Sequence, residues 1–203
     1  MLFNSFTFLV FFVIVSILYF LMPHKKRWIL LLVASYIFYM AWKPTLIVLI
    51  VFSTFCNFII SLRIYKSRSD KRRKKLLLIS LIINFGLLFI VKYSVFINES
   101  FMYVYKSLAT MFFEASGQAT PVAIEMAENL LGNYPLNDFD IILPMGISFY
   151  TFQAAAYTID VYRGVIKPVR HYGIFSLYIT FFPQLVAGPI ERSKNLMPQF
   201  FRR

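Results

Sequence analysis

The sequence is poor in cysteine, histidine and charge. The single cysteine, Cys56, lies in an apolar run, so no internal disulfide can form and we interpret the thiol as buried and inert. His24 and His171 are the only histidines, and neither has a cysteine, carboxylate or second histidine at metal-ligand spacing. Charged residues make up 15% of the chain, compared with about 25% in an average soluble domain. These shortages argue against a disulfide scaffold and a zinc module.

Several catalytic motifs are also missing. The sequence has no glycine-rich phosphate loop, serine nucleophile elbow or zinc-protease helix. The first five residues carry no positive charge and no small-residue cleavage site follows them, so a removable signal peptide is not predicted. The first apolar run is therefore expected to remain as a membrane helix.

What the chain does contain is apolar, with 59% hydrophobic and 19% aromatic residues among 203. A helix crosses a bilayer with about 17–25 mostly apolar residues. The sequence predicts an all-α, polytopic membrane bundle with about five to six membrane segments plus short interfacial helices, in one membrane domain over residues 1–203. The predicted segments are residues 6–22, 28–42, 45–62, 76–97, 141–159 and 173–190.

The positions of the charges predict an orientation. Three basic residues at 24–27 and eight at 63–75 fall on the same side of the predicted bundle, which the positive-inside rule makes cytoplasmic. The N-terminus is then outside, and residues 98–140, with six acidic residues, form an extracytoplasmic segment of a protein in the plasma or inner membrane. Helical spacing predicts an interfacial helix over 98–113, and Thr120-Pro121 predicts a short helix that ends at Gly132.

The net charge of +12 fits either nucleic acid or an anionic membrane surface. The densest basic run, residues 71–75, continues directly into an apolar run. We therefore interpret it as a cytoplasmic anchor beside anionic headgroups, and predict no nucleic-acid binding.

A helix with polar residues on two stripes is predicted from Pro144 onward. At 100° per residue, one stripe holds Tyr150, Gln153, Tyr157 and Asp160, and another holds Thr151 and Thr158. Such a helix is expected to pack inside a bundle or line a polar passage, because lipid does not suit polar side chains on two faces. Asp160 has the alternative of pairing with Arg163.

The last apolar run is interrupted by Pro183, Gly188 and Pro189. Broken backbone at membrane depth is tolerated where protein buries it or where it lines a cavity. The interruption would shape a substrate or acyl-donor tunnel or be only a kink, and the run either spans or re-enters. The candidates for substrate passage or structural hydrogen bonds are Ser148, Tyr150, Gln153, Tyr157, Asp160 and Gln184. No residue is nominated as catalytic or metal-binding.

Three blocks of sequence resemble membrane-bound O-acyltransferases (the MBOAT family) of the alginate O-acetyltransferase type. The blocks are PMGISFY at 144–150 with YTIDVYRG at 157–164, FPQLVAGPI at 182–190, and LLLVASYIFY at 30–39 followed by Trp42. The resemblance covers nearly the whole chain and implies a helical bundle that transfers an acyl group, commonly acetyl, to an extracytoplasmic polysaccharide or cell-wall polymer. It also implies an acyl donor, acetyl-CoA or an acyl carrier, as co-substrate, no bound cofactor, and a separate extracytoplasmic partner protein.

The chain departs from this family in length. Family members carry an essential histidine in a later Trp-His element, and neither His24 nor His171 has that context. The chain is therefore expected to be the N-terminal part of an acyltransferase, inactive alone, as a truncated product or a fragment. A small transporter or channel subunit and a non-catalytic remnant are the alternatives.

Overall fold

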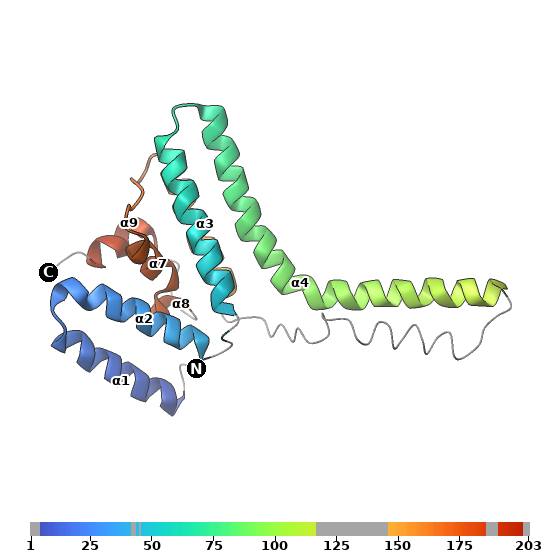
Figure 1. Cartoon of the computed structure of the whole chain (residues 1–203), viewed down its shortest axis with the longest axis horizontal. Coiled ribbons are helices and arrows are strands. Elements are labelled where there is room, and N and C mark those ends of the chain that lie inside the picture. Colours follow the sequence, from blue (N-terminus) through green and yellow to red (C-terminus); the bar gives the residue numbers. More distant parts are fainter. Residues whose placement is uncertain (1–4, 42–43, 45, 117–145, 186–190, 201–203) are drawn as a thin grey trace. The chain divides into compact units, whose positions relative to one another are not determined.

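The structure is a computed structural model that describes residues 5–41, 44, 46–116, 146–185 and 191–200. Every regular element in these ranges is a helix and none is a strand, as the predicted all-α class requires (Figure 1). The elements are α1 (Phe6–Leu21), η1 (His24–Lys26), α2 (Arg27–Met40), α3 (Leu46–Lys66), α4 (Asp70–Ser116), α6 (Ile147–Tyr162), α7 (Tyr172–Thr180), α8 (Phe182–Leu185), α9 (Ser193–Leu196) and η2 (Met197–Phe200).

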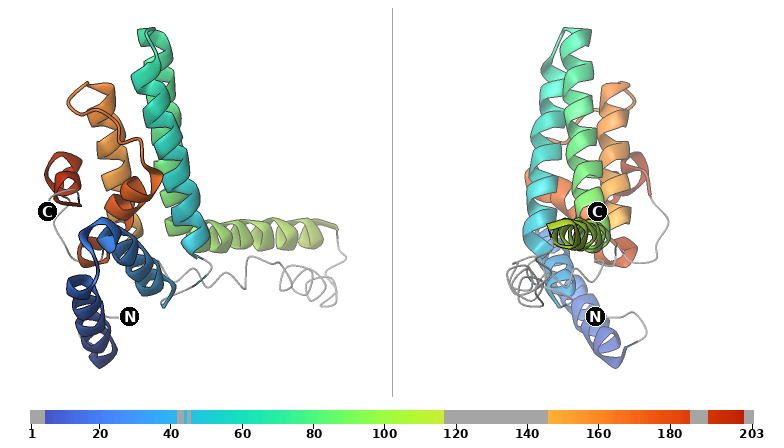
Figure 2. Two further views of the ribbon diagram at one scale, coloured as in Figure 1. Left: turned by 60° about the vertical axis from the view of Figure 1, so that its left-hand side comes forward. Right: turned by 90° about the vertical axis from the view of Figure 1, so that its right-hand side faces the viewer.

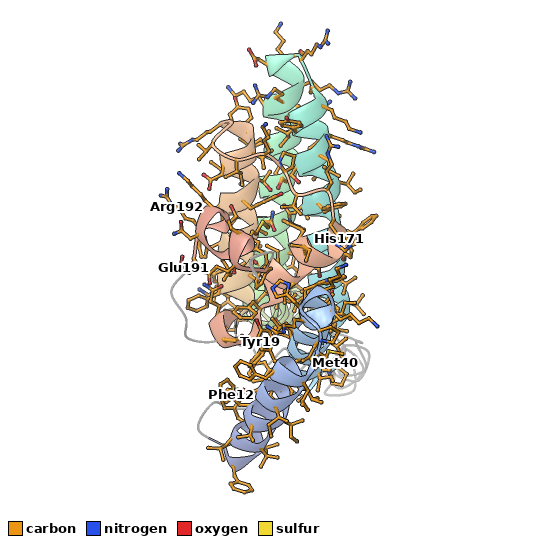
Figure 3. The ribbon with its side chains drawn as sticks, turned by 90° about the vertical axis from the view of Figure 1, so that its left-hand side faces the viewer. Phe12, Tyr19, Met40, His171, Glu191 and Arg192 are labelled. Carbon is orange, nitrogen blue, oxygen red and sulfur yellow. The ribbon has the colours of Figure 1, made fainter. Side chains whose placement is uncertain are left out.

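Large apolar side chains cover the outside of the helices. Phe6 is 79% exposed and Leu21 is 76% exposed, and Figure 3 shows Phe12 projecting away from α1. In the described ranges, Ile47–Lys66 and Asp70–Tyr93 are long and apolar enough to cross a membrane, and α1 is a shorter apolar helix. An apolar surface of this kind is stable in lipid and not in water. The chain is an all-α membrane protein, while its number of spans stays a prediction.

The chain divides into two compact units, which are described separately. One consists of Met1–Leu88 with Pro144–Arg203, and the other is Phe89–Leu143. The described part of the second unit is the end of α4. The candidate site lies in the first unit, to which the contacts below belong.

In the first unit, α1 packs on α2 through a narrow apolar stripe. The hydroxyl of Ser5 caps α1 by accepting a hydrogen bond from the backbone N–H of Phe8 at 3.2 Å. The buried side of α1 is Val15, which joins a cluster with Ala34 and Phe38 of α2 and Phe182 of α8. This cluster holds α1 against the helices that form the site.

A tight connection joins α3 to α4 (Figure 1). The predicted loop over residues 63–75 is wrong in extent, because Arg63 and Lys66 lie in the last turn of α3 and residues 71–75 lie at the start of α4. Lysine and arginine are good helix formers, and Asp70 in the first turn favours a helix start there. Its placement on the cytoplasmic side stays a prediction.

Helix α4 continues for 47 residues through Ser116. The helix predicted over 98–113 is present, but as the continuation of the apolar run at 76–97 and not as a separate element. At 1.5 Å per residue α4 is roughly 70 Å long, so part of it must lie outside a hydrocarbon core of about 30 Å. The short helix predicted between Thr120 and Gly132 lies outside the described residues.

The last two predicted segments differ from the observed helices. Helix α6 begins at Ile147, because Gly146 before it has φ of 89°, a left-handed conformation that suits glycine. Helix α7 has nine residues, or about 14 Å, which is under half of a hydrocarbon core. A single spanning helix over 173–190 is therefore wrong, and re-entry of this segment stays a prediction.

Candidate functional site around the break between α7 and α8

Helix α6 is the most enclosed long helix of the first unit. It lies beside α3 and the first part of α4 (Figure 2, right), and nine of its sixteen residues are buried. The buried set includes Tyr150, Gln153 and Tyr157, together with Thr151 and Thr158 from the second polar stripe. Both stripes therefore face protein, which agrees with a helix packed inside a bundle.

The chain leaves helical geometry at Phe181, between α7 and α8. In a continuous helix the N–H of Phe182 would donate to the carbonyl of Tyr178, four residues earlier. Here the Phe182 N–H donates to Ser35 Oγ of α2 at 3.2 Å. The Tyr178 carbonyl accepts from Gln153 Nε2 of α6 at 2.9 Å. Two tertiary hydrogen bonds thus replace the helical bond that the break removes.

We call Ser35 and Gln153 the break clamp. Ser35 also donates its hydroxyl proton to the Leu31 carbonyl at 2.7 Å, which orients its oxygen toward Phe182. Ser35 is 1% exposed and Gln153 is 6% exposed, so water does not compete for these bonds. Buried backbone groups need such partners.

Gln184 was the side chain expected to satisfy the freed backbone, and this interpretation is wrong for the Phe182 N–H and the Tyr178 carbonyl. Its backbone N–H donates to the Phe181 carbonyl at 3.0 Å, which closes the first turn of α8. Pro183 explains why the helix cannot continue, because it has no N–H and its ring would clash with the carbonyl four residues earlier. Whether Gln184 contacts substrate stays a prediction.

Tyr157 connects α6 to the segment that leads into α7. Its hydroxyl accepts a hydrogen bond from the backbone N–H of Val169 at 2.9 Å, and its ring lies 4.7 Å from that of Phe175. Tyr178 of α7 donates its hydroxyl to the Glu191 carbonyl at 3.2 Å. These contacts hold the chain on both sides of α7.

The other predicted site residues are less engaged. Tyr150 is buried near Tyr39 of α2, whose hydroxyl has no hydrogen-bond partner among the described residues. Ser148 and Asp160 are half-buried. Asp160 forms no ion pair with Arg163 in the described part of the chain. The structure therefore joins Gln153 and Tyr157 to α7, and leaves Tyr150, Ser148 and Asp160 outside that set of contacts.

A buried polar layer between α3, α4 and α6 was missed by the sequence analysis. Asn57 and Asn84 exchange amide hydrogen bonds of 3.0 and 2.8 Å. The Asn57 carbonyl oxygen also accepts from Ser80 at 2.6 Å and from Thr158 at 3.4 Å. All four side chains are at most 1% exposed. The only signal in the sequence is an isolated asparagine within each of two apolar runs.

His171 has a structural role at the start of α7. Its Nδ1 accepts from the backbone N–H of Ile174 at 3.4 Å, and its ring lies 4.9 Å from that of Trp28. In the described ranges no group of three or more His, Cys, Asp or Glu side chains could hold a metal ion. What α2, α6 and α7 do assemble is a set of hydroxyl and amide groups, which can bind and orient polar groups.

Comparison with known proteins relates the whole chain to O-acetylating enzymes. It is 33% identical to a probable alginate O-acetylase AlgI of Pseudomonas aeruginosa and 32% identical to that of Pseudomonas syringae, each over 205 aligned residues covering 100% of this chain and 35% of the relative. It is 28% identical to a peptidoglycan O-acetyltransferase of Helicobacter pylori over 199 residues, covering 86% of this chain and 32% of the relative. No protein-family model matches the chain. No solved structure matches it either.

The chain thus spans about a third of the length of these curated relatives. The aligned third includes α2, α6 and the break, because the alignments with the two Pseudomonas proteins cover the chain completely. The resemblance predicted from the three sequence blocks is confirmed.

Proposed function

We propose, from the premise that this chain is a homologue of about a third of the alginate-type membrane-bound O-acyltransferases, that it forms part of such an enzyme. The reaction is transfer of an acyl group, acetyl in the first instance, to an extracytoplasmic polysaccharide or cell-wall polymer. The observation that carries the proposal is similarity along the whole chain to alginate O-acetylases, joined by a peptidoglycan O-acetyltransferase. The names of these relatives share acetyl transfer and differ in polymer, which favours an acyltransferase over a transporter, a channel or a remnant.

The role proposed for the described residues is to shape a passage. The break clamp keeps α7 and α8 apart by satisfying the backbone between them, and Tyr157 fixes the segment before α7. Ser148, Tyr150, Asp160 and Gln184 are the side chains available to meet substrate. Hydroxyl and amide groups can orient an acceptor hydroxyl or an acyl carbonyl by hydrogen bonds.

A chimaera tests the proposal. The first third of the Pseudomonas aeruginosa alginate O-acetylase is replaced by residues 1–203, and the acetyl content of alginate from the complemented strain is measured. We expect acetylation well above that of the same relative lacking its first third. Membrane levels of both proteins, measured by immunoblot, serve as the control. A chimaera that reaches the membrane at normal levels without any acetylation would contradict the proposal.

The isolated chain is expected to show no acyl transfer. Among the described residues of α2, α6 and α7, His171 is the only histidine, and its Nδ1 is occupied by a backbone N–H. General base catalysis requires a histidine or carboxylate within hydrogen-bond reach of the reacting hydroxyl. Turnover by purified residues 1–203 that survives replacement of both His24 and His171 would reject this expectation.

The donor, partner and orientation are proposals of the same kind. We propose acetyl-CoA or an acyl carrier as donor, a separate extracytoplasmic partner protein, and the plasma or inner membrane with the N-terminus outside. In a Cys56→Ser background, Ser69→Cys should react with an impermeant thiol reagent only after the cells are opened. Gln118→Cys should react in intact cells, and the reverse pattern would reject the orientation.

A further inference from the structure

Cations from three elements gather at one end of the α3–α4–α6 bundle. Helix α3 ends with Arg63 and Lys66, α4 begins two to three residues later, and Arg163 directly follows α6. The guanidinium of Arg73 donates to the Tyr162 carbonyl and lies over the Tyr162 ring, which brings the start of α4 to the end of α6. We call the exposed cations at this end the basic end: Arg63, Lys66, Arg68, Lys71, Arg72, Lys74, Lys75 and Arg163.

These eight charges are not neutralised within the described residues. The one ion pair there joins Asp70 to Arg73 at 3.5 Å, and Arg73 is not a member of the basic end. Asp160 is the other carboxylate close by, and it is half-buried and forms no ion pair in the described ranges. Nitrogen-tipped side chains extend outward from the α3–α4 connection in Figure 3. Like charges held together produce a positive potential that attracts an anionic partner.

The surface next to the basic end is apolar. On α4, Leu78 is 56% exposed and Ile82 is 61% exposed, one and two turns beyond Lys75. Tyr65 on α3 is 50% exposed, and Val165 after α6 is 55% exposed. A binding face for nucleic acid has no need of exposed leucine and isoleucine one turn from its cations. Cations bordering an apolar surface match the level where headgroups meet hydrocarbon.

We propose that the basic end binds the phosphate headgroups of anionic phospholipids. The proposal adds Arg163, far away in sequence, to the cations of the α3–α4 connection, and leaves out Arg73, whose guanidinium is committed to Tyr162 and Asp70. It does not depend on acyl transfer.

The test measures binding of dioctanoyl phosphatidylglycerol to the purified full chain in a neutral detergent by calorimetric titration, with dioctanoyl phosphatidylcholine as the uncharged-headgroup probe. Each cation near an anionic surface is worth about a fivefold change in binding, so the native chain should prefer phosphatidylglycerol at least about tenfold. A variant with Lys71, Arg72, Lys74 and Lys75 all changed to Gln should lose this preference. Raising the salt to 1 M should weaken it, because the Debye length falls to about 3 Å.

A matched variant separates a defined surface from net charge alone. Changing Lys25, Lys26, Arg192 and Lys194 to Gln removes the same charge from exposed positions outside the basic end. This variant should keep most of the preference, and equal losses in both variants would overturn the proposal. The pair Lys71→Gln and Lys74→Gln, which should lose part of the preference, tests the surface again if the fourfold variant does not fold.

Two further probes distinguish the source of the phosphate. Inorganic phosphate alone and a single-stranded RNA of about 20 nucleotides are titrated under the same conditions. The proposal expects weaker binding of both than of phosphatidylglycerol. Binding of free phosphate equal to that of lipid would indicate a soluble-anion site, and tighter binding of RNA would indicate a nucleic-acid surface, so either result would overturn the proposal.

Discussion

Helices α1 and α6 have sixteen residues each, and their burial is opposite to what their composition suggests. Helix α1 is almost entirely apolar, yet Val15 is its one buried residue. Helix α6 carries tyrosine, threonine, glutamine and aspartate, yet nine of its residues are buried. In a soluble protein the apolar helix would be the inner one.

The difference follows from the solvent. Lipid is as apolar as leucine, so an apolar side chain gains little by leaving it, whereas a polar side chain gains a hydrogen-bond partner by turning inward. The break clamp and the Asn57–Asn84 layer are the places where this gain is realised. Polar contacts should therefore dominate the stability of the inner helices, and changes on the outer face of α1 should have little effect.

The largest loss is expected from Asn57→Ala. This change removes the acceptor of Ser80 and the reciprocal partner of Asn84, both of which are fully buried. Leaving buried donors unsatisfied should cost about 2–3 kcal/mol of unfolding free energy. Thermal unfolding in detergent measures the loss as a lower Tm.

The double variant Asn57→Ala with Asn84→Ala is the control for this layer. Because the second change removes a group that the first leaves unpaired, its cost should be clearly less than the sum of the two single costs. Additive costs would mean that the two asparagines act independently.

A loss of about 1–3 kcal/mol is expected from Gly173→Ala, which overpacks the contact between α2 and α7. A Cβ at this position would lie 2.5 Å from Trp28 Cζ3 and 3.2 Å from His171 Cε1. Gly86→Ala in α4 is the matched control, since no atom lies within 4 Å of its added Cβ, and it should raise the Tm slightly through helix propensity. A tolerated Gly173→Ala would show that Trp28 can move aside.

Apolar runs predicted the helices well and their ends poorly. The first three runs match α1, α2 and α3 to within a few residues. The start of α4 was missed because basic residues were assigned to a loop, although they form helix readily. The break at Phe181 was assigned to the correct segment, because Pro183 is visible in the sequence, but its partners come from α2 and α6.

The candidate site was predicted only as far as one helix reveals it. Periodicity identified Gln153 and Tyr157 as inward-facing polar residues of α6, and both are buried with partners near α7. Ser35 and Asn57 were missed because each is a single polar residue in an apolar run. Their importance depends on which helix lies opposite, and one sequence does not contain that information. The use of any of these residues in substrate passage stays a prediction.

A smaller loss, about 1 kcal/mol, is expected from Ser35→Ala. The change deprives the buried Phe182 N–H of its acceptor but removes only one oxygen atom. Ser35→Thr keeps the hydroxyl and should retain most of the stability. Amide hydrogen exchange at Phe182, measured by mass spectrometry, should accelerate in the alanine variant and not in the threonine variant. Equal exchange in both would contradict the role of the clamp.

The smallest effects should come from two valines of α1 that differ only in position. Val15 is 7% exposed and packs in the cluster with Phe38 and Phe182, so Val15→Ala should cost about 1 kcal/mol through lost methyl burial. Val13 is 47% exposed, and Val13→Ala should stay within about 0.5 kcal/mol. Because both substitutions remove the same atoms from the same helix, the difference in Tm isolates packing from composition. If both were equally harmless, α1 would not be held by this cluster, and if both were equally harmful, its outer face would contact protein as well as lipid.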